Sequence, residues 1–185
     1  MEKKKTAICV FCGSSFGTDP AFRDAARAIG AGIAKMGARL VFGGGGPGLM
    51  GDVARAARDA GTQVEGILPG FLRDVEPPLT EGETTEIVPD LFERKQKMIG
   101  RSDGFIVLPG GLGTYDEFFE VVTSVQLSVI AKPIILVNVN GYFDPLEALL
   151  QHSVKSGFVR PENLKLYRIV PDAEVALAMM AEALG

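Results

Sequence analysis

A glycine-rich segment near the middle of the chain leads directly into two acidic residues. The segment Pro109-Gly-Gly-Leu-Gly-Thr-Tyr-Asp-Glu117 carries a hydroxyl at Thr114 and carboxylates at Asp116 and Glu117. A glycine-rich turn before a helix lets backbone N–H groups approach an anion, and the helix N-terminus adds partial positive charge. A glutamate in the first helical turn is expected to stay ionised, because the helix dipole favours the charged form. Glu117 is therefore a candidate to stabilise positive charge or to activate water.

The same spacing also fits a purely structural interpretation. Thr114-x-x-Glu117 matches a capping box, in which Thr114 caps the helix and Glu117 reaches back to the N–H of the cap. Two acidic residues directly after a phosphate-type loop would repel phosphate unless they pointed elsewhere. Spacing alone leaves capping and catalysis as open alternatives for Glu117.

Two more segments rich in small residues are candidates for the same site, Gly13-Ser-Ser15 and Gly43–Gly51. The second contains two overlapping G-x-G-x-x-G matches and makes Gly44 and Gly45 candidate contacts for an anion. It follows the second predicted strand instead of the first, and the acidic residue that holds the ribose of NAD about 20 residues further on is missing. Without a G-x-x-x-x-G-K-[ST] motif, an NTPase is disfavoured as well. A small phosphate-bearing ligand remains.

A basic pair, Arg94 and Lys95, occupies the helix predicted at residues 90–101. The apolar face of this helix, placed at 100° per residue, consists of Leu91, Phe92, Met98 and Ile99. Lys95 falls at the centre of that face and Arg94 on its flank. Either their aliphatic stems carry the charges out to water, or both side chains point into a crevice where a phosphate or a carboxylate binds them.

The segments that must position these residues alternate between short apolar runs and helical stretches. Strands are predicted at Ala7–Cys12, Arg39–Phe42, Gln63–Leu68, Gly104–Leu108, Ile134–Val139 and Ile169–Val170. Helices are predicted at Ala21–Met36, Met50–Ala60, Asp90–Arg101, Thr114–Ile130, Pro145–Ser156 and Glu174–Leu184. Apolar strands separated by helices indicate an α/β fold, a Rossmann-like doubly wound parallel sheet in a single domain spanning residues 1–185. With strand order 3-2-1-4-5-6, the three glycine-rich loops meet at the carboxyl edge of the sheet.

Composition and charge exclude several classes of function. A net charge of -4 argues against a nucleic acid polymer as ligand, and no apolar run approaches the roughly 20 residues of a membrane span. The basic start of the chain leads into no secretory segment, so we expect a cytoplasmic protein. Cys9 and Cys12 have C-x-x-C spacing but no second Cys/His pair. We expect them to be buried as small apolar residues, with no metal bound.

Taken together, these motifs resemble the Lonely Guy (LOG) family of cytokinin-activating phosphoribohydrolases. The resemblance covers nearly the whole chain and rests on the P-G-G-x-G-T-x-x-E signature at 109–117, on Cys9-Val-Phe-Cys-Gly-Ser-Ser15, on Gly-Leu-Met-Gly51, on Glu93-Arg-Lys95 and on Lys132-Pro133. It implies a homodimer that hydrolyses the N-glycosidic bond of a purine nucleoside 5′-monophosphate without a cofactor. It further implies Arg94 and Glu117 as the catalytic pair. The implied substrate contacts are Lys95, Gly110, Gly111, Gly113, Thr114, Asp116, Thr123 and Glu76.

Two positions depart from the family pattern, and two other functions remain as alternatives. Phe92 stands where family members often carry histidine, and Val125 where they often carry tryptophan. If these positions line the base pocket, the substrate is AMP or another purine monophosphate as readily as an isopentenyl-adenine nucleotide. The first alternative is a protein that binds or senses nucleotides without turnover. The second is a pyridoxal-phosphate lysine decarboxylase, although no Schiff-base lysine is marked in the sequence.

Overall fold

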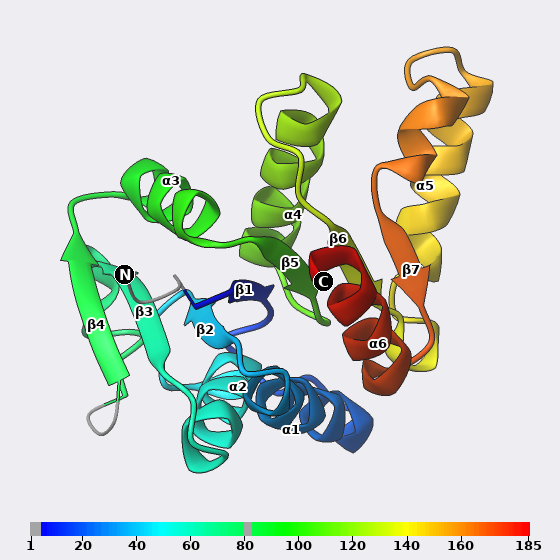
Figure 1. Ribbon diagram of the computed structural model, residues 1–185. Coiled ribbons are helices and arrows are strands. Elements are labelled where there is room, and N and C mark those ends of the chain that lie inside the picture. The colour runs from blue at the N-terminus through cyan, green and yellow to red at the C-terminus, as the bar shows by residue number, and fades with distance from the viewer. Residues whose placement is uncertain (1–4, 80–82) are drawn as a thin grey trace.

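The protein is built around a seven-stranded sheet in which every pair of neighbouring strands is parallel (Figure 1). The computed structural model describes residues 5–79 and 83–185. The strand order is β4-β3-β2-β1-β5-β6-β7. The strands are β1 (Ala7–Phe11), β2 (Arg39–Phe42), β3 (Val64–Pro69), β4 (Glu83–Val88), β5 (Gly104–Val107), β6 (Ile134–Val137) and β7 (Arg168–Val170).

Helices cover both faces of this sheet (Figure 1). One face carries α1 (Pro20–Lys35), α2 (Gly48–Asp59) and α6 (Ala173–Leu184), and the other carries α3 (Leu91–Arg101), α4 (Leu112–Gln126) and α5 (Asp144–Lys155). Short 3-10 turns lie at Gly70–Leu72, Val139–Gly141 and Pro161–Lys165. No helix within the described ranges is long and apolar enough to cross a bilayer.

The central strands read as continuous apolar runs because both of their faces are buried. Ile8 and Val10 pack with residues of α1, α2 and α6, whereas Ala7, Cys9 and Phe11 pack with residues of α3 and α4. Successive side chains of a strand point to opposite faces, so each residue of β1 enters one of the two cores. This arrangement confirms the predicted doubly wound α/β fold.

The predicted strand order is confirmed, but one strand was missed. β4 pairs with β3 and is the last strand at this end of the sheet among the described residues. Its sequence, Glu-Thr-Thr-Glu-Ile-Val, carries no apolar run that would mark a buried strand. Edge strands commonly carry charged residues, which hinder pairing of the free edge with another chain.

The two helices that begin in glycine-rich loops start two residues earlier than predicted. α2 begins at Gly48 instead of Met50, and α4 begins at Leu112 instead of Thr114. α4 also ends at Gln126, before the predicted end at Ile130, and Ser128 just beyond it has a positive φ of 58°. Glycines in the first turn hid both starts, because helix propensity counts glycine as a breaker.

Candidate functional site

A cavity of about 290 Å³ opens at the carboxyl edge of the sheet, where the loops after β1, β2, β3 and β5 meet α3. Its wall is formed by Cys12, Gly13, Ser14, Met50, Leu72, Glu76, Leu91, Arg94, Gly111, Leu112, Gly113, Thr114 and Glu117. A larger cavity of about 440 Å³ lies at the opposite edge, between the starts of β6 and β7 and the end of α6. That cavity contains no residue of the glycine-rich motifs, so the smaller one is the candidate site.

The loops after β1 and β5 touch each other through glycine backbone. The N–H of Gly13 donates to the carbonyl of Pro109 at 3.0 Å. A Cβ on Gly110 would lie 2.7 Å from the nitrogen of Gly13 and 2.1 Å from Oγ1 of Thr114. The hydroxyl of Tyr142 in turn donates to the carbonyl of Gly110. Only glycine fits at position 110, and its contacts hold both loops in place at the cavity.

Thr114 does not cap α4, which overturns the capping interpretation. The N-cap of α4 is Gly111, and no side chain makes a capping hydrogen bond there. Thr114 is therefore the third residue inside the helix, where it is buried. Glu117 lies in the second turn, too far along the helix to reach the N–H of the cap. Its carboxylate faces the cavity instead.

Burial sets the protonation of Glu117. The residue is only 9% exposed, and this burial raises the pKa of its carboxyl to about 7, against the lowering effect of Arg94. Asp116 and Glu76 raise the pKa further, whereas Lys95 lowers it. The expectation that the helix dipole keeps Glu117 ionised was wrong. The dipole acts mainly within the first turn, whereas Glu117 stands beyond that turn in a desolvated position.

Arg94 extends from α3 into the same cavity. The residue is 8% exposed, and its Nη2 donates to the carbonyl of Gly43 at 3.1 Å. The same nitrogen lies 3.9 Å from Oε1 of Glu117, an ion-pair distance without a hydrogen bond. Its buried Nε has no hydrogen-bond partner within the described part of the chain. A Cβ at position 43 would lie 1.9 Å from Nη2 of Arg94, so Gly43 is what admits the guanidinium.

Lys95 does not join Arg94 in the cavity, contrary to one of the two predictions. Its Nζ contacts Asp116 at 3.0 Å and Glu120 at 2.9 Å, on the outer side of α4. Burial lowers the pKa of Lys95, but hydrogen bonds to Glu120 and Asp116 outweigh that effect and leave the pKa raised. Thr123 and Asp116 line a separate hollow on this outer side. Lys95, Asp116 and Thr123 therefore form a group apart from Arg94 and Glu117.

The buried side of α3 differs from the predicted apolar face. Leu91 is 43% exposed and Phe92 is 81% exposed, whereas Arg94 and Met98 are the buried residues of this helix. The sheet below α3 presents the carboxylates of Glu65 and Glu86. The helix therefore turns Lys97 and Arg101 to the sheet, while Leu91, at the cavity wall, and Phe92 remain exposed.

Some of the remaining predicted substrate contacts line the cavity, and others lie outside its wall. Gly111, Gly113 and Glu76 line the cavity, whereas Gly110 lines a neighbouring one. Gly44 and Gly45 stand behind the wall, and a Cβ on Gly45 would come within 3.3 Å of Oε2 of Glu76. Gly45 therefore leaves room for Glu76, whereas Gly44 has a positive φ of 80° and packs against Ile67 and Leu68 of β3.

Several wall residues were not predicted as contacts, and the two cysteines behave as expected. Ser14, Met50 and Leu72 line the cavity, and each follows a strand on its carboxyl side, which is the signal that would have found them. Cys9 and Cys12 are buried and free. Burial raises the pKa of both thiols well above the ordinary value, so neither is a ready thiolate.

Comparison with known proteins places the chain among nucleotide-processing relatives. The model of a family described as "Possible lysine decarboxylase" matches residues 50–180. A rice protein named "Probable cytokinin riboside 5'-monophosphate phosphoribohydrolase LOGL9" is 45% identical over 167 residues, which is 90% of this chain and 73% of the rice protein. The Arabidopsis thaliana protein "Cytokinin riboside 5'-monophosphate phosphoribohydrolase LOG3" is 40% identical over 186 residues, which is 98% of this chain and 85% of that protein.

Solved structures agree on the fold. The molybdenum cofactor binding protein from the phototrophic bacterium Rippkaea orientalis superposes with a TM-score of 0.74 at 21% identity, covering 100% of both chains. At this level of identity the likeness concerns the fold alone. The sequence relatives carry the family assignment, because they match over 90% or more of this chain at 40–45% identity. The chain therefore belongs to the Lonely Guy (LOG) family.

Proposed function

We propose that this protein hydrolyses the N-glycosidic bond of a purine nucleoside 5′-monophosphate, releasing the free base and ribose 5-phosphate. The observation that carries the proposal is the pairing of Glu117 with Arg94, both buried and 3.9 Å apart, in the wall of one cavity. The relatives named as cytokinin riboside 5′-monophosphate phosphoribohydrolases support the same reaction.

The N-terminus of α4 is suited to hold the 5′-phosphate. No side chain of the described ranges caps this helix, and the first backbone N–H groups have no intrahelical partner, so they are available to an anion. Gly111, Gly113 and Thr114 line the cavity at this point. A phosphate bound here leaves its ribose between the helix terminus and Glu117, one turn further along α4.

Cleavage of the glycosidic bond places positive charge on the ribose. As the bond between C1′ and the base nitrogen breaks, its electron pair leaves with the base, and an oxocarbenium-like centre develops at C1′. The ionised carboxylate of Glu117 stabilises that centre and orients water for attack. Water supplies the hydroxyl at C1′ and the proton that the base takes up. The Arg94 guanidinium favours the ionised form of Glu117.

We expect the purine base to contact apolar residues of the cavity wall, and not Phe92 or Val125, the two positions that depart from the family pattern. Phe92 and Val125 are both absent from the wall of this cavity in the described part of the chain. Met50, Leu72, Leu91 and Leu112 do line it. We propose that these side chains accept a purine, with AMP and isopentenyl-type nucleotides both among the candidate substrates.

A pyridoxal-phosphate decarboxylase does not fit this cavity, despite the description attached to the matching family. Among the described residues, no lysine lines it to form a Schiff base. The nearest candidate in sequence, Lys95, is held on the outer side of α4 by Asp116 and Glu120. We therefore derive no step through that cofactor.

The outer side of α3 and α4 supports a homodimer as part of the proposal. Large apolar side chains are exposed along these helices and just beyond α4, at Leu91, Phe92, Leu112, Leu127 and Val129. Exposed apolar groups of this kind mark protein interfaces, and a second copy of the chain is the proposed partner. Sedimentation of the wild type and of Leu127→Asp tests this, since a monomeric wild type would contradict it.

We also propose a cytoplasmic location, supported by two buried free thiols.

A panel of nucleosides and nucleotides tests the reaction itself, with released base and ribose 5-phosphate measured by chromatography. We expect AMP-type monophosphates to be cleaved and the matching nucleosides to react poorly. Saturable nucleotide binding without any released base would instead favour the non-catalytic alternative.

A further inference from the structure

α3 buries little apolar surface, although it carries Arg94. Only Arg94 and Met98 are buried in this helix, and Leu91 and Phe92 are exposed. Apolar packing usually holds an amphipathic helix to its sheet. For α3 that contribution comes from Met98 and the partly buried Ile99, so polar contacts are needed to help set its position.

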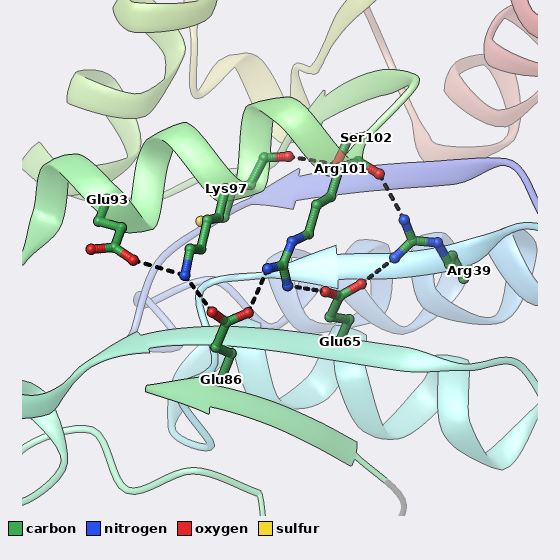
Figure 2. Close-up of polar contacts among 8 residues, drawn as sticks. Arg39, Glu65, Glu86, Glu93, Lys97, Arg101 and Ser102 are labelled. Atoms are coloured by element: carbon green, nitrogen blue, oxygen red, sulfur yellow. Dashed lines mark hydrogen bonds and ion pairs between the residues drawn. The ribbon is translucent and has the colours of Figure 1, made fainter. Parts of the chain in front are cut away.

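Those contacts form a continuous chain of ion pairs between α3 and the sheet (Figure 2). Glu86 on β4 binds Lys97 and lies 2.5 Å from Nη2 of Arg101. Glu65 on β3 binds Nη1 of the same arginine and also binds Arg39 at the start of β2. The two carboxylates thus connect the second half of α3 to the sheet.

The helix end is held by the same groups. Nη2 of Arg39 donates to the backbone carbonyl of Arg101 at 2.8 Å, and Lys97 also contacts Glu93 on its own helix at 2.7 Å (Figure 2). Ser102 closes the last turn by donating from its hydroxyl to the carbonyl of Met98. A carbonyl at the C-terminus of a helix favours such a cation.

The anchored residues share one face of α3 with Arg94. Lys97 and Arg101 follow Arg94 at three and seven positions, the spacing that aligns side chains along a helix. A slide or rotation of α3 would therefore move the Arg94 guanidinium away from the carbonyl of Gly43 and from Glu117. We propose that Glu65 and Glu86 are positioning residues that place Arg94 against Glu117 by anchoring α3 through Lys97 and Arg101. This inference rests on the proposed function of the Arg94–Glu117 pair.

The amide variants Glu86→Gln and Glu65→Gln test the anchor, and Asp59→Asn is the matched control. Asp59 forms an ion pair with Arg58 on α2, on the opposite face of the sheet. Each variant loses one negative charge and one acceptor of an ion pair. If α3 shifts, kcat for AMP should fall about 10-fold or more, since a displacement of about 1 Å can cost up to about 10²-fold in rate. The control should stay within about twofold of wild type.

The titration of Glu117 separates a positioning role from a purely electrostatic one. The charged groups that act on Glu117 are Arg94 and Lys95 of α3, Asp116 of α4 and Glu76 of the loop after β3. Glu117 in turn raises the pKa of the Cys9 and Cys12 thiols, which stay neutral in this pH range. Removing the negative charge of Glu86 should by itself favour ionised Glu117 and lower its midpoint. Withdrawal of Arg94 should raise the midpoint, because Arg94 lowers the pKa of Glu117.

The measurement is a carboxyl carbon NMR titration of folded protein, with the Glu117 signal identified by its loss in Glu117→Gln. We expect the midpoint to move upward in Glu86→Gln, together with the loss of kcat, and to stay unchanged in Asp59→Asn. An unchanged or lowered midpoint with kcat within about twofold would overturn the proposal. Glu65→Gln gives the same readout if Glu86→Gln does not fold. If wild type releases no base, the proposed reaction fails, whereas the titration still decides whether the two glutamates place Arg94.

Discussion

The guanidinium of Arg94 lies 3.9 Å from the carboxylate of Glu117, close enough to act on its charge without a hydrogen bond between the two. Arg94 is instead hydrogen-bonded to the backbone of Gly43. This arrangement leaves the Glu117 oxygens facing the cavity. A carboxylate held in this way can respond to charge that develops on a bound ribose.

Hydrolysis should increase with pH through neutrality. Burial raises the pKa of Glu117 to about 7, and the ionised form is the one that stabilises the oxocarbenium-like centre. The fraction of active enzyme therefore grows as pH rises through that value. Values of kcat/KM for AMP between pH 5.5 and 8.5 check this, since this ratio reports the pKa of the free enzyme. A rate that fell with rising pH over this range would assign Glu117 as a proton donor instead.

Glu117→Gln should separate catalysis from stability. Loss of the charge is expected to reduce kcat about 10²-fold, the scale of one preorganised electrostatic group, while AMP binding persists. The folded pKa of about 7 exceeds the ordinary value of 4.5. The contribution of this carboxyl to the free energy of unfolding is therefore fully present below the ordinary pKa of 4.5. That contribution is lost as the pH rises through the folded pKa of about 7.

Glutamine has no such loss. The melting temperature of Glu117→Gln relative to wild type should therefore rise between pH 5 and pH 8. The expected rise is a few degrees for each ~1 kcal/mol of stability that wild type loses. Thermal melts at the two pH values check this. Turnover close to wild type in the glutamine variant would rule out the proposed mechanism.

Gly111→Ala and Gly110→Ala should fail in different ways. A Cβ on Gly111 meets nothing within 4 Å, so the folded protein should keep its melting temperature. The added methyl group nevertheless enters the cavity wall at the start of α4, and KM for AMP should rise about 10-fold or more if the phosphate lies there. A Cβ on Gly110 collides with Thr114 and Gly13. Gly110→Ala should therefore have a lower melting temperature as well as a higher KM for AMP. If Gly111→Ala and wild type bound AMP with equal affinity, the phosphate would have to lie elsewhere.

Asp52→Asn should destabilise the protein from the face opposite to α3. The carboxylate of Asp52 is buried and binds Arg23 at 2.8 Å, Arg55 at 2.9 Å and Arg27 at 3.5 Å. Burial raises its pKa, but the hydrogen bonds from Arg23 and Arg55 outweigh this and leave the pKa lowered. Weakening these charge-assisted bonds should cost about 1–3 kcal/mol.

The cost should appear in chemical denaturation at neutral pH. Asp24→Asn is the matched control, because Asp24 is exposed and its contact with Arg27 is 3.9 Å long. The two variants should differ clearly in the free energy of unfolding, and equal values would show that the arginines gain nothing from Asp52. Arg55 also donates to the carbonyl of Gly46 in the glycine-rich loop after β2. The KM for AMP should therefore rise in Asp52→Asn and stay unchanged in Asp24→Asn.

Much of the fold is readable from the sequence because its signals are local. The strands of the central sheet are buried on both faces, which makes each of them a short apolar run between helical segments. The glycine-rich loops after the first, second and fourth predicted strands likewise predict a phosphate-binding site at the carboxyl edge of the sheet. β4 escaped this reading because Glu86 is compensated by Lys97 and Arg101 from α3, partners that a strand pattern does not contain.

The sequence by itself determined the family, the doubly wound sheet and the residue types at the site, because motif spacing and periodicity are properties of neighbouring residues. Only the tertiary structure decided that Arg94 faces the cavity while the adjacent Lys95 binds Asp116 and Glu120 outside it. It likewise decided that Glu117 stands beyond the first turn of α4 and titrates near neutrality. Both outcomes depend on burial and on charges brought from distant segments, and neither quantity exists until the chain has folded.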